Sequence, residues 1–380
     1  MDALQKIIFF LLVVCLTSGV YPARLFGQSD STEATRPNKE KNLFAIGVGH
    51  QRGFIFAHSQ AVQNTKGAHP AGLELMLSWQ RNDAAAWDLC NCYPRKGLLL
   101  TYYDFDNAIL GRGFSAAYFL EPQYRLYKNL FFSFKGAAGF SYLTNPFDSI
   151  RNPTNQSYST HLSAYLLVGA GFWFPINRHW WGNASANYQH VSNGGLRQPN
   201  KGINWPTAGI ALHYQKEARR FYTGIRTKEK FWKAYPWRWE AALFGIARRA
   251  LDENGNSRRL PLAGFALQTG KQVGRINALT AGTEIYRDEE LRLKLKRDSV
   301  NASPVKAGVL AGHAFLLGRF VFSQRLGVYI FDQTPYYDRL YHRWGIDYKI
   351  NQHLGAGINL QAHRQVADFA DFRLTYTFRK

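Results

Sequence analysis

Apolar and polar residues alternate with a period of two from Leu43 almost to the end of the chain. The last such segment shows it plainly, with Phe372, Leu374, Tyr376 and Phe378 alternating with Arg373, Thr375 and Thr377. A period of two places each set on one face of a β-strand. No segment keeps a helical period for more than about two turns, so the chain is expected to be all-β.

The alternation predicts about 12–16 antiparallel strands, an even number being expected. The candidate segments are residues 43–56, 71–80, 96–104, 113–126, 129–143, 161–174, 179–192, 204–215, 238–250, 260–275, 277–288, 304–318, 319–332, 339–350, 353–365 and 370–379. Longer connections separate some of them. The charged and aromatic connection 216–237 is either a loop or the seam between an eight-strand unit and an added half.

The polar face of these strands is rich in Gly, Ser, Thr and single charges, and aromatic residues crowd the strand ends. This composition is typical of the lumen and the interfacial girdles of a membrane barrel. Lipid tolerates no open sheet edge, so the sheet must close. We therefore predict an antiparallel transmembrane β-barrel of the outer membrane over residues 43–380, with residues 28–42 as a flexible lead-in.

The N-terminal residues predict export. Lys6 precedes an apolar run over residues 7–16, which is the layout of a secretory signal peptide and is too short to span a bilayer. We expect residues 1–27 to be removed after Gly27, with Ala23 as the other candidate for the cleavage position.

Charge and cysteine content narrow the partners. The chain has 47 Lys+Arg against 26 Asp+Glu, and an exported barrel would direct this charge to anionic lipid headgroups rather than to nucleic acid. Cys90 and Cys92 are spaced for a small loop disulfide, which an oxidising compartment permits. No further metal ligands lie near them, and we expect neither a metal nor a cofactor. The oligomeric state is left open.

One segment carries candidate chemistry. On strand 179–192, His190 and Ser192 continue the apolar phase of Ala184, Ala186 and Tyr188. Both side chains are therefore expected on the outer face, one above the other. Lipid offers them no hydrogen bonds, so stability gives no reason for the pair, whereas a site that acts on lipid would need it there.

The next strand supplies a third group. Asn204 falls in register with the apolar phase of Pro206 and Ala208 and can approach His190. A nucleophile, a base and an orienting group would then lie side by side. The glycine-rich stretch between the strands contains Asn193, Gly195 and Asn200, and its amides could stabilise an oxyanion.

This stretch resembles the lipid A 3-O-deacylases (PagL-type outer-membrane hydrolases) and the related acyloxyacyl hydrolases. The shared pattern is His-x-Ser-Asn-x-Gly followed by Pro-Asn-x-Gly, here residues 190–195 and 199–202. The resemblance implies Ser192 as nucleophile and His190 as general base, with Asn193, Gly195 and Asn200 around the oxyanion hole. It covers about residues 43–215 and leaves the additional strands of 238–380 without a counterpart.

Two departures from the family pattern keep alternatives open. The family has an orienting Glu where this chain has Asn204, and its barrel has eight strands. We predict an esterase that hydrolyses an acyl ester of lipopolysaccharide or another outer-leaflet lipid. The alternatives are a porin-like or structural barrel without chemistry, and an outer-membrane phospholipase, since those barrels also use Ser, His and Asn.

Overall fold

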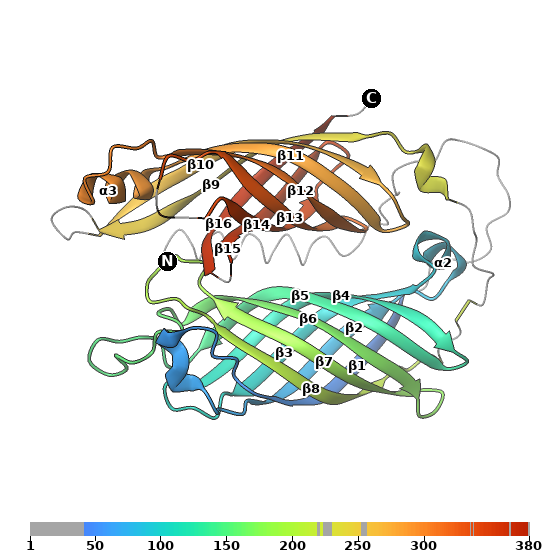
Figure 1. Cartoon of the computed structure of the whole chain (residues 1–380). Helices are drawn as coiled ribbons and strands as arrows, with labels where there is room; N and C mark the ends of the chain where they lie inside the picture. The colour runs from blue at the N-terminus through green and yellow to red at the C-terminus, as the bar shows by residue number, and fades with distance from the viewer. Residues whose placement is uncertain are drawn as a thin grey trace.

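Two closed antiparallel barrels make up the computed structural model (Figure 1). It describes residues 42–218, 221–222, 230–251, 257–334, 336, 338–364 and 366–378. The expected signal peptide and the expected lead-in, apart from residue 42, lie outside the described residues.

The first barrel contains eight strands that pair in chain order. They are β1 (Leu43–Gly53), β2 (Ala71–Gln80), β3 (Tyr93–Asp104), β4 (Arg112–Tyr127), β5 (Leu130–Leu143), β6 (Leu162–Pro175), β7 (Trp180–Ser192) and β8 (Ile203–Tyr214). Its short helices are η1 (Gln60–Thr65) and α2 (Ala84–Cys90).

The second barrel repeats this arrangement with eight further strands. They are β9 (Arg238–Leu251), β10 (Ser257–Gln272), β11 (Asn277–Asp288), β12 (Val305–Leu317), β13 (Phe320–Phe331), β14 (Leu340–Lys349), β15 (Leu354–His363) and β16 (Val366–Phe378). Helix η2 (Phe231–Ala234) lies in the linker, and α3 (Glu289–Arg297) follows β11.

The all-β class, the antiparallel pairing and the predicted strands are confirmed. The strands form two closed barrels, however, and not the single barrel expected over residues 43–380. Strand β8 returns to β1, with Tyr214 opposite Ile46, and β16 returns to β9, with Phe372 opposite Gly245. Both edges of β8 are thereby occupied, so β9 cannot extend the first sheet. The connection 216–237 therefore joins two separate barrels. The sequence left this open, because alternation predicts strands but not their partners.

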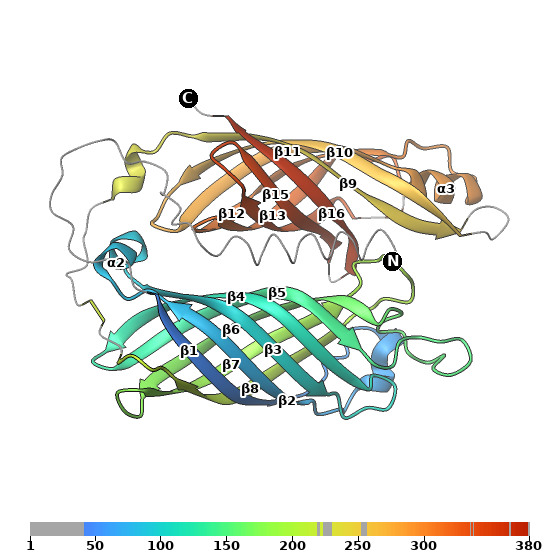
Figure 2. The ribbon, with the colours of Figure 1, turned by 180° about the vertical axis from the view of Figure 1, so that it is seen from behind.

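Each barrel has one end with short turns and one with long loops. The short-turn end of the first barrel carries the turns 128–129 and 176–179 and one longer connection, residues 81–92, which contains α2; that of the second barrel carries the turn 318–319. The long-loop end of the first barrel carries residues 54–70, 105–111, 144–161 and 193–202, and that of the second carries α3. An even number of strands returns the chain to its starting side, so the linker joins the two short-turn ends, as both views show (Figures 1 and 2).

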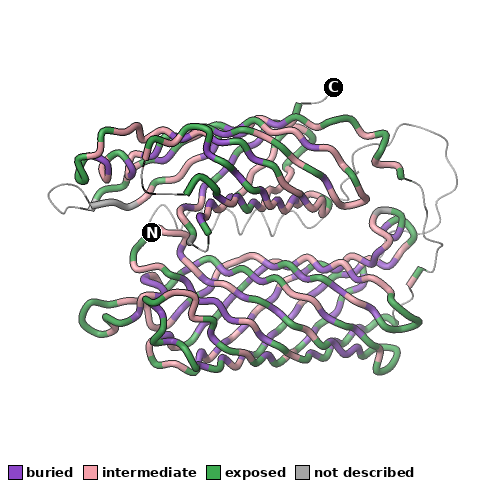
Figure 3. Tube along the Cα trace, in the orientation of Figure 1, coloured by how far each residue is buried: buried purple, intermediate pink, exposed green. Residues whose placement is uncertain are grey.

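Burial alternates along the strands as the sequence predicts (Figure 3). On β7, Ala184, Ala186 and Tyr188 are exposed on the outer wall, whereas Asn187 and Gln189 are buried in the lumen. Exposed aromatic side chains gather where the first barrel's strands meet its short-turn end, namely Phe44, Trp79, Trp180 and Tyr214. This is the position expected of an interfacial girdle.

The lumen of the first barrel is filled by side chains. Arg95 donates to Glu121 at 2.7 Å, and its guanidinium lies 4.4 Å from the centre of the Trp173 ring. Glu121 also accepts from Ser133 at 2.8 Å. Aromatic clusters occupy both ends, with Phe105 and Trp205 in edge contact on the long-loop side. Buried side chains thus occupy the lumen along its length.

The second lumen is also packed, around Arg343. It donates to Glu284 at 3.0 Å and pairs with Asp371, and all three side chains are almost fully buried. Tyr286 and Tyr329 exchange a 2.9 Å hydrogen bond nearer the long-loop end. In both lumens the buried charges named here are paired with an opposite charge, as buried charges generally are.

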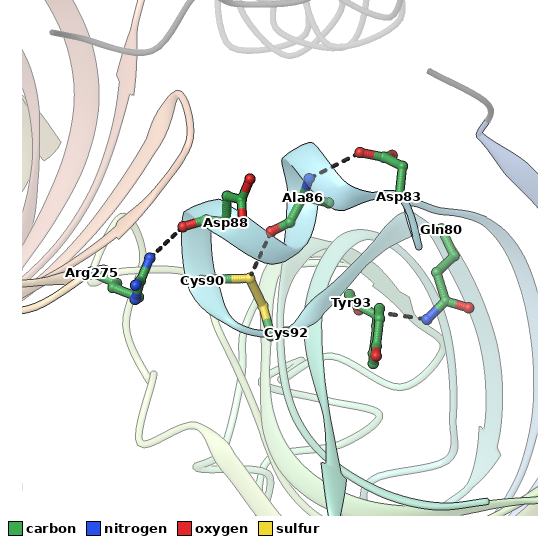
Figure 4. Close-up of a disulfide and its surroundings, with 8 residues drawn as sticks. All are labelled: Gln80, Asp83, Ala86, Asp88, Cys90, Cys92, Tyr93 and Arg275. Atoms are coloured by element: carbon green, nitrogen blue, oxygen red, sulfur yellow. Dashed lines mark hydrogen bonds between the residues drawn. A yellow bond between two sulfur atoms is a disulfide. The ribbon is translucent and has the colours of Figure 1, made fainter. Parts of the chain in front are cut away.

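Helix α2 lies at the short-turn end and is closed by a disulfide (Figure 4). The Asp83 carboxylate caps it by accepting from the Ala86 amide at 2.9 Å, and Asn91 ends it in the left-handed region. Cys90 and Cys92 are bonded to each other, so the expected loop disulfide is confirmed. No helix among the described residues is long and apolar enough to cross a membrane.

Replacing Arg95 tests the buried lumen pair. We expect Arg95→Ala to lower the free energy of unfolding by about 3–5 kcal/mol, because Glu121 stays buried without its partner charge. The matched control is Arg112→Ala, whose ion pair with Asp104 is exposed and should contribute no more than about 1 kcal/mol. Urea titration of the folded barrel measures both, and equal losses would contradict this account.

Cutting the linker tests the independence of the two barrels. A protease site inserted after Ala218 should yield two fragments that both keep folded, heat-modifiable migration in a detergent gel. Each sheet closes on itself, so cleavage opens no edge. Loss of folded migration by either fragment after cleavage would show that one barrel depends on the other.

Candidate functional site

Strands β7 and β8 bring the predicted residues together at the long-loop end of the first barrel. The register places His190 directly opposite Asn204, and Ser192 opposite Ala164 of β6. His190 and Ser192 continue the outward phase of β7 and are half-buried. The predicted outer-face positions of all three site residues therefore match the strand geometry.

Asn204 connects two histidines. Its Oδ1 lies 2.7 Å from His190 Nδ1, and its Nδ2 lies 2.9 Å from His58 Nδ1. The backbone beyond β1 continues along β8, with the Phe56 amide donating to the Asn204 carbonyl at 2.8 Å. This pairing carries His58 over Asn204, which is only 9% exposed despite its outward position.

The Ser192 hydroxyl is held by the start of the following loop. The Gly194 amide donates to Ser192 Oγ at 3.4 Å. In the described part of the chain, no hydrogen bond joins Ser192 to His190. Their side chains lie on one face of β7 with a single residue between them, and the small side chain of Ala164 leaves space beside Ser192.

The loop 193–202 is held by its own asparagines. The Asn193 amide donates to Asn200 Oδ1 at 2.9 Å, and the Gly195 amide donates to Asn193 Oδ1 at 3.0 Å. Asn193 Nδ2 donates to the Arg197 carbonyl at 2.8 Å. The amides of Asn193 and Gly195 thus stabilise the loop, and the Gly194 amide is the one directed at Ser192.

Gly202 fixes the position of the His190 ring. Its φ of 78° lies in the left-handed region, and a Cβ added there would lie 2.7 Å from His190 Cε1. Only glycine provides both the backbone conformation and the space. The glycine of the Pro-Asn-x-Gly motif therefore contacts the candidate base directly.

Apolar side chains surround the site on the outer wall. Leu166 lies opposite His190 on β6, and Tyr188 lies opposite Pro206 between β7 and β8. Leu166 and Tyr188 are exposed. A hydrocarbon chain could lie along this wall beside Ser192.

His58 is the site residue that sequence reasoning missed. His58 is 146 positions from Asn204 in the chain, and only the closure of β1 against β8 brings the two together. Gly194 lies within the recognised motif, but its amide direction depends on the loop conformation. No signal in the sequence distinguishes His58 from the other histidines.

Strand β15, as the structure describes it, carries no His-x-Ser pair at the equivalent positions. The last outward positions of β15, which corresponds to β7 by strand order, are Leu360 and Ala362. Over the described ranges, no group of three potential metal ligands comes together in either barrel.

The described cations of the linker lie away from the site. Lys216, Lys230 and Lys233 are exposed on a segment that leaves β8 at the short-turn end. Arg219, Arg220 and Lys228 lie outside the described residues.

Solved structures show only a low structural similarity to this chain. A mutant of the TodX monoaromatic hydrocarbon channel shares 8% identity over 90% of each chain, with a TM-score of 0.19. A mutant Rh. blastica porin shares 12% identity over 89% of this chain and 100% of its own, with a TM-score of 0.20. Scores this low carry no argument. No curated protein sequence matches the chain.

Family models match both barrels. The model described as lipid A 3-O-deacylase (PagL) matches residues 64–215, and the model described as acyloxyacyl hydrolase, C-terminal domain, matches residues 237–380. The first range covers β2 to β8 of the first sheet, the second covers the whole second sheet, and together they span most of the chain. The chain therefore belongs to the lipid A 3-O-deacylase (PagL) family and carries an acyloxyacyl hydrolase C-terminal domain as its second barrel.

Proposed function

We propose that the first barrel is an esterase that removes an acyl chain from lipid A or a related outer-leaflet glycolipid. The observation that carries the proposal is the outward-facing group of Ser192, His190 and Asn204, with Asn204 Oδ1 2.7 Å from His190 Nδ1. Family membership supports hydrolysis of an acyl ester, with lipid A as the substrate class.

The proposed reaction begins with the tautomer of His190. Asn204 Oδ1 accepts a hydrogen bond from the N–H at Nδ1, which leaves the Nε2 lone pair free to act as general base. Ser192 Oγ rotates from the Gly194 amide toward Nε2, transfers its proton and attacks the ester carbonyl. His190 then protonates the leaving alkoxide, and water releases the acyl chain from Ser192 with the same base.

Two donors are suited to the tetrahedral oxyanion. The Gly194 amide already reaches Ser192 Oγ at 3.4 Å. Asn200 uses its Oδ1 to hold the Asn193 amide, so its Nδ2 is the end that remains for an oxyanion. We assign Asn193 and Gly195 to the support of this loop and Asn200 to direct stabilisation.

The loops indicate which side of the membrane the site faces. The family and the barrel fold point to the outer membrane. Outer-membrane barrels have short periplasmic turns and long extracellular loops. The site lies at the long-loop end, so we infer that it acts in the outer leaflet, where the apolar wall around Leu166 and Tyr188 would receive an acyl chain.

An Asn at position 204, in place of the Glu of the family pattern, supports His190 less well as a base and also suits a different kind of esterase. A carboxamide orients imidazole but adds no negative charge to stabilise imidazolium, whereas the family's Glu does. A Ser-His-Asn site also suits an outer-membrane phospholipase, which is the second candidate. The packed lumens of both barrels argue against a porin-like role.

Replacing the nucleophile tests the esterase. Ser192→Ala should leave a folded barrel and lower ester hydrolysis at least about a thousandfold. Ser185→Ala is the matched control, because this serine lies on β7 but bonds to Gln51 in the lumen. Mass spectrometry of lipid A from expressing cells should show loss of an acyl chain with wild type and the control alone. Deacylation by the Ser192 variant would exclude this mechanism.

Gly202→Ala tests the packing of the base. The added methyl should displace His190 and lower kcat, beside a backbone strain of about 1–2 kcal/mol. Gly67→Ala is the control, because Gly67 has a similar φ of 86° and open space at its Cβ. Both variants should lose comparable stability in urea, but only Gly202→Ala should lose activity. Equal activity of the two variants would count against a role for this contact.

A further inference from the structure

The Asn204 carboxamide has two different ends, and only one is useful to His190. If the oxygen faces Nδ1, it accepts a hydrogen bond from the N–H there, and Nε2 is left unprotonated as a base. A nitrogen facing Nδ1 would donate instead, which requires the proton on Nε2 and removes the base from the side of Ser192. The activity of the site therefore depends on the direction in which this side chain points.

Nothing in the His190–Asn204 pair itself sets that direction. Both atoms of the carboxamide terminus can form a hydrogen bond to a neutral imidazole, because the imidazole offers a donor in one tautomer and an acceptor in the other. A second contact to the carboxamide can restrict it. His58 Nδ1 lies 2.9 Å from Asn204 Nδ2, so a neutral His58 with its proton on Nε2 accepts a hydrogen bond there and leaves Asn204 Oδ1 to face His190.

The loop holds His58 firmly against Asn204. The Phe56 amide is bonded to the Asn204 carbonyl, two residues before His58. On both sides of His58, the Gln63 carboxamide donates to the carbonyls of Ala57 at 3.2 Å and Ser59 at 3.4 Å. The histidine is thus presented by a braced loop rather than by a free side chain on the surface.

We propose that His58 is a positioning residue that orients Asn204 and, through it, selects the catalytic tautomer of His190. Resting on the esterase proposed above, it extends the site to a relay of Ser192, His190, Asn204 and His58. Neutral His58 carries its proton on Nε2 and accepts from Asn204 Nδ2. Asn204 Oδ1 then accepts a hydrogen bond from the N–H at His190 Nδ1. His58 thereby compensates for the Glu that the family pattern has at position 204.

Nitrogen NMR of the full chain, labelled at its histidines and folded in detergent micelles, tests the relay without any substrate. In the neutral form of each ring, His190 should be the Nδ1-protonated tautomer and His58 the Nε2-protonated one. His58→Gln and His190→Gln spectra assign the signals. His58→Ala should shift the His190 signals toward a mixture of tautomers. Reversed tautomers, or unchanged His190 signals in His58→Ala, would overturn the proposal.

Kinetics provide the second readout. His58→Ala should lower kcat about two- to tenfold, the value of one hydrogen bond, with KM unchanged. His69→Ala, an exposed histidine of the same loop, should have no effect. In an Asn204→Glu background, where a carboxylate accepts from His190 at either oxygen, His58→Ala should no longer matter. The same loss in both backgrounds would assign His58 a structural role only.

The two experiments separate the failure of this inference from failure of the esterase. If wild type releases no acyl chain but shows the expected tautomers, the relay holds and the proposed substrate or reaction is wrong. If wild type is active and the His190 signals ignore His58, the esterase holds and the relay is wrong.

Discussion

Hydrogen bonding between the first and last strand of each sheet is the constraint on which the rest of this structure depends. Lipid cannot satisfy a free strand edge, so a sheet that crosses a membrane must close. The pairing of β1 with β8 and of β16 with β9 achieves this twice within one chain. Once closed, each barrel offers no edge to the other, and the linker joins two independent sheets.

The same closure assembles the candidate site. The chain beyond β1 pairs with the start of β8, which brings His58 to Asn204. Asn204 in turn faces His190 across the β7–β8 pair. The proposed nucleophile and base come from one strand, the proposed orienting amide from the next, and His58 from the opposite end of the barrel's sequence.

The two faces of the first barrel distribute polar groups differently. In the lumen, the buried side chains of Arg95 and Glu121 form an ion pair with each other. On the outer wall, Ser192 and His190 lie among apolar side chains, and their hydrogen-bond partners are Asn204 and the Gly194 amide. Polar groups in such a position cost stability, which is the pattern expected where function rather than folding selects the residues.

The sequence by itself determined the strands, their inner and outer faces, and the motif that contains Ser192, His190 and Asn200. These features depend on a period of two and on local residue order, both of which can be read along the chain. Only the tertiary structure decided that Tyr214 meets Ile46 and that His58 meets Asn204, because every strand carries the same alternation and none specifies its partner. The direction of the Gly194 amide was likewise set by the folded loop, since several loop conformations fit the same glycines.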